Sequence, residues 1–390
     1  MAALRLVALA LSLVVWIVPA HAIDIKEVKS KGGITAWLVH DSTNPLIAMQ
    51  FSFSGGSTAD PAGKEGTAHF LTGMMDEGAG DLDSAAFQAR RDEFAMKMSF
   101  DSSFDNFTGK FQTLTDKREE SFALLKLALT APRFDQGPFE RMRDQFIVGA
   151  RQSEEDPDTI ASTAWMARGL AGHPYARLSE GSPATLATIT PDDLRAMHKK
   201  LFSRRGLKIA VVGDIDEQTL TRLLDETFGG LPDTDPPALP PVAHIAAKAG
   251  TTVIDRDIPQ SVVVFGHEGI LRSDPDFIPA FVTSFILGGG GFGSRLMEEV
   301  REKRGLTYGV SLGLYPLDRA GLVWGALSTR NEKAAEAISV TRDTLKRFAE
   351  EGPTADELAD VKTYLTGSYA LRFDSNAKIA EQLLGLQEQG

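Results

Sequence analysis

The sequence predicts an α+β protein of two homologous domains, each with a mixed, mostly antiparallel sheet and helices packed on one face. Short runs rich in β-branched and aromatic residues interleave with longer runs of helical periodicity. The second part of the chain opens as the first does, with two strand-like runs and a helix, which indicates an internal duplication. A proline-rich segment separates the two parts.

The separating segment is residues 231–250, LPDTDPPALPPVAHIAAKAG. Five prolines fall in its first eleven residues, and so many prolines exclude a helix or a central strand. We interpret it as a linker between an N-terminal domain, residues 23–230, and a C-terminal domain, residues 251–390.

The elements of the first domain are expected from local periodicity. Strands are predicted at residues 34–41, 46–57, 99–114 (a pair) and 207–215. Helices are predicted at residues 67–75, 118–131, 137–157, 191–202 and 216–231, with Pro157 ending the third.

The second domain repeats only part of this order. Strands are predicted at residues 251–257, 261–269 and 306–329, and helices at residues 276–287, 332–352 and 354–373. The first domain's closing helix–strand–helix has no counterpart, and residues 381–390 carry no recognisable closing element. We therefore expect the C-terminal domain to be truncated at its end.

Composition narrows the function classes. A net charge of −12 argues against nucleic acid or an anionic membrane surface as a partner. The absence of cysteine excludes disulfides, thiolate metal sites and cysteine nucleophiles.

Residues 1–22 resemble a secretory signal peptide. Arg5 precedes a short apolar run, Leu6–Val18, and an A-x-A cleavage pattern ends at Ala22. The run is shorter than the roughly 20 residues that a membrane-spanning helix needs. We expect cleavage before Ile23 and a periplasmic location, with no membrane span afterwards; an uncleaved anchor is the alternative.

Several motifs, in their order and spacing, resemble one peptidase family. They include GTAHFLTGMM, SEEDP, HPYARLSEGSPATLATITPDDLRAMHKKLF, VVGDID and LGGGGFGSRLMEEVREKRGLTYGV. Over nearly the whole mature chain, the sequence resembles the pitrilysin/insulinase-type (inverzincin) metallopeptidases, and most of all the bacterial relatives of the mitochondrial processing peptidase. The family's zinc motif is H-x-x-E-H on a helix, completed by a distal Glu.

The resemblance also implies that most of the zinc motif is missing here. Alignment on AHFL keeps His69 as the first imidazole, but places Thr72 at the general base, Gly73 at the second imidazole and Gly149 at the distal ligand. A threonine cannot replace a carboxylate base, and a glycine has no metal donor. We therefore predict no catalytic residue and no metal in this chain, and expect His69 to be a hydrogen-bonded helix residue.

A rebuilt metal site is the alternative for this region. Asp76 lies in helical phase with His69, Glu77 follows it, and residues 154–156 are acidic. We favour the interpretation that these carboxylates are solvated at helix ends.

The family's substrate-binding segment, in contrast, is present. The resemblance assigns substrate binding to Arg301 and Tyr308, seven residues apart. An arginine fork can hold a peptide carbonyl or an acidic group, and a tyrosine hydroxyl can donate to a developing oxyanion. The alternatives are a solvated charge and an ordinary strand aromatic.

A glycine-rich loop precedes this pair. Its glycines are Gly288, Gly289, Gly290, Gly291 and Gly293. They also satisfy the dinucleotide pattern G-x-G-x-x-G, but a helix rather than a strand is predicted before them. We interpret the run as a flexible loop that positions peptide.

The resemblance implies a chamber closed by two two-domain units. We expect this chain to be the non-catalytic, substrate-binding subunit of a heterodimeric zinc metallopeptidase that cleaves peptides or unfolded segments. The partner would be a homologous subunit with an intact H-x-x-E-H motif, which would hold the zinc. A structural scaffold subunit and an autonomous peptidase with a rebuilt metal site are the alternatives.

Overall fold

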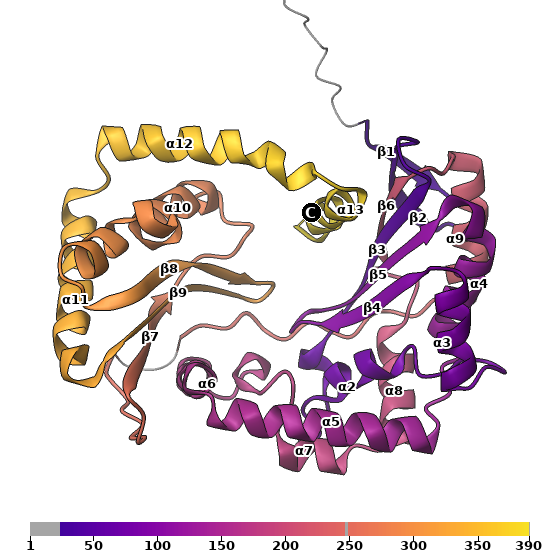
Figure 1. Ribbon diagram of the computed structural model, residues 1–390, viewed down its shortest axis with the longest axis horizontal. Coiled ribbons are helices and arrows are strands. Elements are labelled where there is room, and N and C mark those ends of the chain that lie inside the picture. The colour runs from indigo at the N-terminus through magenta and orange to yellow at the C-terminus, as the bar shows by residue number, and fades with distance from the viewer. Residues whose placement is uncertain (1–23, 246–248, 390) are drawn as a thin grey trace, which may run out of the picture.

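The computed structural model describes residues 24–245 and 249–389, so the expected signal peptide lies outside the described residues. The two sheets lie on opposite sides of the molecule, each with its own helices (Figure 1). The mixed, mostly antiparallel character predicted from the sequence is confirmed, because only β2 and β6 pair in parallel.

The first sheet has six strands in the order β1-β2-β6-β3-β5-β4. Its strands are β1 (Lys26–Lys29), β2 (Thr35–His40), β3 (Leu46–Ser54), β4 (Lys97–Ser102), β5 (Asn106–Leu114) and β6 (Lys208–Gly213). The helices of this part are α2 (Thr67–Met74), α3 (Ser84–Glu93), α4 (Arg118–Thr130), α5 (Gln136–Glu155), α6 (Pro157–Gly169), α7 (Pro183–Thr188), α8 (Pro191–Leu201) and α9 (Glu217–Phe228).

The second sheet has three strands in the order β7-β9-β8. Its strands are β7 (Gln260–Glu268), β8 (Thr307–Leu317) and β9 (Ala320–Arg330). Its helices are α10 (Phe277–Ser284), the π-helices η4 (Phe285–Gly289) and η6 (Met297–Glu302), the short 3₁₀ turn η5 (Gly291–Gly293), α11 (Ala334–Glu351), α12 (Ala355–Tyr369) and α13 (Asn376–Gln389).

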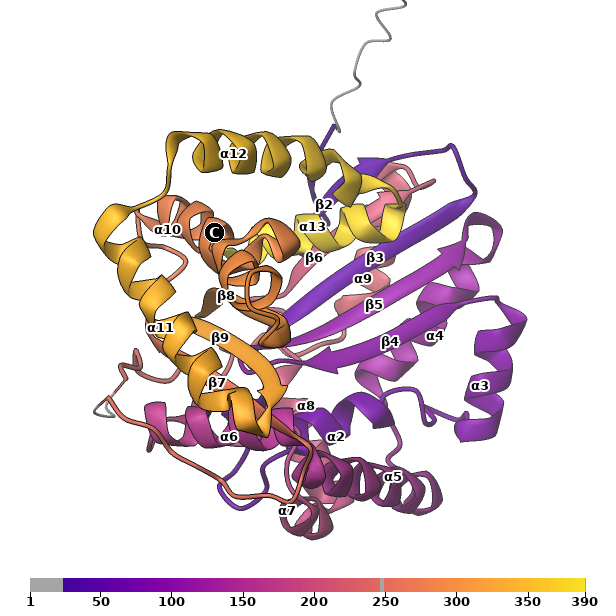
Figure 2. The same cartoon turned by 60° about the vertical axis from the view of Figure 1, so that its left-hand side comes forward.

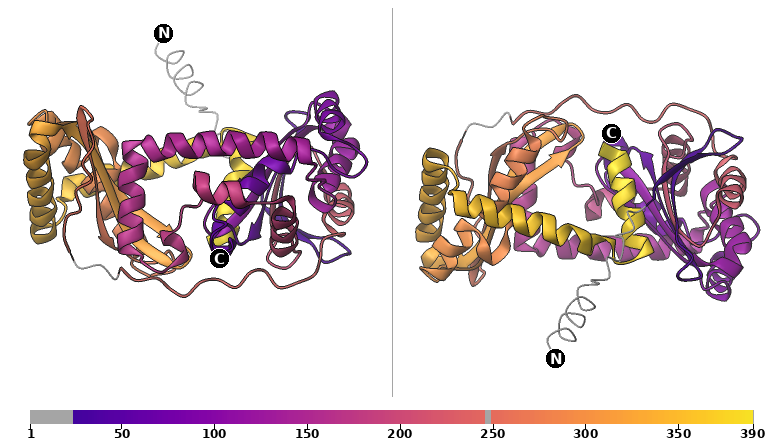
Figure 3. Two further views of the ribbon diagram at one scale, coloured as in Figure 1. Left: turned by 90° about the horizontal axis from the view of Figure 1, so that it is seen from below. Right: turned by 90° about the horizontal axis from the view of Figure 1, so that it is seen from above.

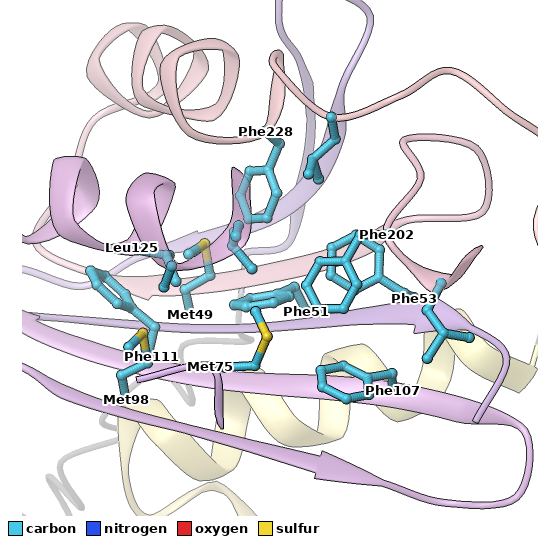
Figure 4. Packing of buried hydrophobic residues seen from close by; sticks show 14 of the residues in the cluster. Met49, Phe51, Phe53, Met75, Met98, Phe107, Phe111, Leu125, Phe202 and Phe228 are labelled. Carbon is cyan, nitrogen blue, oxygen red and sulfur yellow. The ribbon is translucent and has the colours of Figure 1, made fainter. Parts of the chain in front are cut away.

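The main core lies between the first sheet and its own helices (Figure 4). Phe51 is fully buried and packs edge-on against Phe53 and Phe228, with ring centroids 5.9 and 5.4 Å away. Gly109 on the neighbouring strand gives this ring its space, since a Cβ there would lie 2.1 Å from Phe51. The aromatic residues of β3 thus anchor this strand in the core of the first domain.

Successive residues of the first sheet point to opposite faces, and both faces are covered. Leu38 and Val211 enter the main core, whereas Val39 and Val212 pack against Leu383 and its neighbours in α13. The domain's own helices therefore cover one face, as predicted. A helix from the far end of the chain covers the other (Figure 2).

The second sheet receives a helix from the first domain in return. α6 lies against β7, and Trp165 of α6 packs edge-on against Trp324 of β9 at 4.8 Å. The long helices α5 and α12 run along opposite sides of the molecule and lead into α6 and α13 (Figure 3). The two domains thus exchange covering helices.

Two expectations for the second domain were wrong. Residues 251–257 form no strand, because no described residue pairs with them. In the first domain, by contrast, β2 pairs with β6. The end of the chain does carry an element, α13, which was missed because its buried face covers the other domain's sheet. No helix among the described residues is long and apolar enough to cross a membrane.

Candidate functional site

The first candidate region is the start of α2, where the zinc motif was sought. Gly66 enters the helix with a φ of 93°, and the buried Asp60 carboxylate accepts hydrogen bonds from Gly66 N and Ala68 N, both at 2.8 Å. Burial raises the pKa of Asp60 to about 7, although these two bonds oppose the shift. The helix that carries His69 is therefore anchored by a carboxylate at its first turn.

His69 packs against an aromatic ring. Its imidazole meets Phe146 of α5 edge-on, with ring centroids 4.7 Å apart. The expected hydrogen bond is not found: none joins the ring to any residue that the structure describes. Burial lowers the pKa of His69, opposed by the carboxylates of Glu180 and Asp101, so the imidazole is neutral at pH 7.

The slot for the second imidazole is filled by neighbouring side chains. A Cβ on Gly73 would lie 2.6 Å from Met142 Cε and 2.8 Å from Phe146 Cζ. Thr72, in the slot for the base, donates its hydroxyl to the carbonyl oxygen of His69 at 2.7 Å. The residues at this helix therefore do not fit a zinc ion, and Phe146 and Met142 close the space that a second ligand would need.

Gly149, in the distal slot, differs from Gly73. A Cβ there would meet nothing within 4 Å. Side-chain space is thus available on α5, but no donor is present. Among residues 24–245 and 249–389, no group of three or more His, Cys, Asp and Glu side chains is placed to share a metal ion.

Asp76 and Glu77 are paired rather than solvated, which corrects our expectation for these two carboxylates, whereas residues 154–156 are exposed at the end of α5, as expected. Asp76 accepts from Arg91 at 2.6 Å, and its side chain is 25% exposed. Glu77 is only 13% exposed and accepts from Ser84 and Arg141. Burial raises the pKa of Asp76, and Arg91 opposes this shift. Both carboxylates already have cationic partners, which disfavours a rebuilt metal site.

The second candidate region brings Arg301 and Tyr308 together, as a substrate-binding pair requires. The Arg301 guanidinium carbon lies over the Tyr308 ring, 5.1 Å from its centroid. It also lies over the Phe292 ring, 4.4 Å from that centroid. Tyr308 is 88% exposed and Phe292 is 70% exposed. The Arg301 side chain is only 24% exposed, so it is not the solvated charge of the alternative interpretation.

Arg301 also has unused donor capacity. Its Nη1 is buried and has no hydrogen-bond partner among the described residues. Its nearest carboxylate is Glu302, with Nε 3.6 Å from Oε1. A partly exposed guanidinium that contacts two rings can bind a peptide carbonyl or a carboxylate.

Three irregular backbone segments place these side chains. Arg301 lies in the π-helix η6, and Phe292 in the turn η5, next to Gly291 at φ 58°. Tyr308 lies at a β-bulge, because the register of β8 against β9 shifts between Thr307 and Gly309. π-Helices and bulges are common at functional sites, where they redirect side chains.

The glycine-rich loop has a packing role at its start. A Cβ on Gly288 would lie 2.6 Å from Leu312 N, so glycine lets η4 approach β8 closely. Gly289 and Gly290 continue the turn, and a Cβ on Gly291 or Gly293 would meet nothing within 4 Å. Phe292 was missed from the sequence. The available signal was one large apolar residue between glycines.

A small hollow lies beside the pair. It has a volume of about 270 Å³ and begins at Gly309, the residue after Tyr308. Its other lining residues are Met297, Val310, Ser311, Ala326, Leu327 and Ser328. Among the described residues, no contact joins this region to His69, so the two candidate regions are separate within the chain.

Comparisons with known proteins match both parts of the chain to one peptidase family. The family model for insulinase (peptidase family M16) matches residues 36–178, and that for the peptidase M16 inactive domain matches residues 188–365. The chain is 29% identical to the non-peptidase homolog YmxG of Helicobacter pylori, over 84% of this chain and 77% of the relative. It is 21% identical to an uncharacterized zinc protease of Rickettsia bellii, over 91% and 85%.

A solved structure extends the likeness to the fold. The crystal structure of the peptidase M16 inactive domain from Pseudomonas fluorescens superposes with a TM-score of 0.87. The sequences are 30% identical, and the match covers 93% of this chain and 87% of that chain.

Proposed function

The chain belongs to the insulinase family, peptidase family M16, as a non-catalytic member, and we propose that it is the substrate-binding subunit of a heterodimeric zinc metallopeptidase. The observation that carries the proposal is a contrast within one chain. Phe146 and Met142 fill the metal region, whereas Arg301, which is partly exposed, contacts the exposed ring of Tyr308.

The partner in this proposal is a homologous subunit with an intact H-x-x-E-H motif, which holds the zinc. Arg301 would hold a carbonyl oxygen or an acidic group of the peptide through its guanidinium, since its side chain is 24% exposed. Tyr308 would donate its hydroxyl to the same peptide, since its side chain extends into solvent. Substrates would be peptides or unfolded segments, because only flexible chains can enter a closed chamber.

The test combines the purified chain with such a homologue and measures cleavage of a fluorogenic peptide. The mixture should cleave, and each chain alone should not. Arg301→Ala and Tyr308→Phe should each lower kcat/KM of the mixture by about tenfold or more. The matched controls are Arg342→Ala, an exposed arginine on α11, and Tyr369→Phe at the end of α12.

Each rival predicts a different result. Chelator-sensitive cleavage by this chain alone would establish an autonomous peptidase with a rebuilt metal site. If the complex is stable and its activity is unchanged by Arg301→Ala and by Tyr308→Phe, the result would instead favour a structural scaffold role for this chain.

We also propose a periplasmic location, supported by the signal-like residues 1–22. Expression of the full chain in a bacterium with two membranes should release a product that begins near Ile23 in the periplasmic fraction. N-terminal sequencing checks this, and retention of Met1 in a membrane fraction would indicate an anchor instead.

A further inference from the structure

We propose that Phe292 is a third substrate-contacting residue, and that it selects peptides with a large apolar side chain beside the group that Arg301 holds. This inference rests on the proposed function and adds a specificity to it.

The first argument is the exposure of Phe292. Its ring is 70% exposed, although a phenylalanine ordinarily gains free energy from burial. Gly290, Gly291 and Gly293 flank it and have no side chains to shield it. The loop thus presents one large apolar side chain to solvent.

The second argument is the stacking on Arg301. The guanidinium lies over both rings, 4.4 Å from the centroid of Phe292 and 5.1 Å from that of Tyr308. It covers one face of each ring, and the high exposure of both residues leaves further ring surface open. An apolar side chain placed there would remove that surface from water and exclude water from the Arg301 donors.

The third argument is the apolar surface nearby. The 270 Å³ hollow beside Tyr308 has Met297, Val310 and Leu327 in its lining. Gly309, the residue after Tyr308, lines this hollow, so a peptide that extends along β8 from Tyr308 would meet further apolar surface. Gly291 has a positive φ of 58°, a conformation that glycine adopts without strain and that shapes the loop carrying Phe292.

The experiment measures binding by fluorescence anisotropy with the full chain and two fluorescein-labelled Gly/Ser peptides. One peptide carries a central Leu and the other a central Ala. The wild type should bind the Leu peptide about tenfold more tightly. Phe292→Ala should remove most of this preference, and Phe292→Tyr should restore it.

Arg301→Ala should weaken both peptides alike. The matched control is Leu371→Ala, since Leu371 is similarly exposed at 73%. It should leave both affinities unchanged, and thermal melts should show that every variant is folded.

Two results separate this inference from the proposed function. If Phe292→Ala weakens both peptides equally or neither, while Arg301→Ala weakens both, the specificity role is wrong and substrate binding stands. If the wild type binds neither peptide, or Arg301→Ala changes neither affinity, the binding function fails and the Phe292 role fails with it.

Discussion

The Tyr175 hydroxyl donates to the Asp105 carboxylate, at 2.7 and 2.9 Å from its two oxygens, inside the junction between the domains. Both residues are buried. Asp105 also accepts from Asp318 N, and Tyr175 Oη accepts from Arg319 N at 3.0 Å. Asp318 and Arg319 form the turn between β8 and β9, so one hydrogen-bonded cluster ties that hairpin to the first domain.

We expect Tyr175→Phe to destabilise the protein by about 1–3 kcal/mol, because it removes a partner from a buried carboxylate. Urea denaturation measures the change. Tyr369→Phe is the control, since Tyr369 is 49% exposed and its hydroxyl bonds to no described residue. Equal stability of the two variants would mean that the junction does not depend on this bond.

Gly73 and Gly149 stand where the family has metal ligands, and replacing each with alanine should change stability in opposite directions. Gly73→Ala should cost about 1–3 kcal/mol, because its Cβ would overlap Met142 and Phe146. Gly149→Ala should be neutral or stabilise by about 0.5–1 kcal/mol, since a Cβ there meets nothing and alanine favours a helix.

A double-mutant cycle tests the cause of the Gly73 effect. In a Phe146→Ala background, Gly73→Ala should cost much less, because the overlapping ring is gone. An undiminished cost would assign the effect to the helix itself rather than to the filled slot.

The exchanged helix α13 should contribute to stability through one face only. Leu383→Ala should cost about 2–4 kcal/mol, because Leu383 is 2% exposed against the first sheet. Leu386→Ala, on the same helix but 44% exposed, should stay within about 0.5 kcal/mol of the wild type. Similar losses would show that α13 is not held by this contact.

Asp60 should give the protein a distinct pH dependence. Its folded pKa of about 7 lies above the ordinary value of 3.8, so between these pH values the folded state binds a proton that the unfolded state does not. The free energy of unfolding should therefore fall as pH rises from about 4 to 7, by on the order of 3 kcal/mol from this group.

Asp60→Asn isolates that contribution, because other titrating groups remain in both proteins. Urea midpoints measured between pH 4.5 and 7.5 should fall less steeply in the variant than in the wild type. Parallel curves would mean that Asp60 titrates normally in the folded state.

Local sequence patterns predicted most of the strands and helices, because alternation and helical periodicity reflect a core within each domain. The elements β1, α3 and α7 were not predicted, and other failures came where an element depends on a distant partner. Residues 251–257 have the pattern of a strand but no neighbour to pair with, and α6 and α13 each cover the other domain's sheet.

The same limit applies to the candidate site. The family resemblance pointed to Arg301 and Tyr308, and the structure places them in contact. Phe292 joins them only through the fold of the glycine-rich loop. Phe146 of α5 occupies the space beside His69 where a second ligand would lie. Because it comes from a different helix, the spacing within the zinc motif could not reveal it.

The reciprocal covering of the sheets has a mechanical consequence. If the two domains moved apart, Trp165 would lose its contact with the second sheet and Leu383 its contact with the first. Apolar surface would then be exposed on both domains. We therefore expect the chain to move as one rigid body and to melt in one cooperative step. In the heterodimer that we propose, entry and exit of a guest chain would depend on how the two subunits separate, and not on flexing within either one.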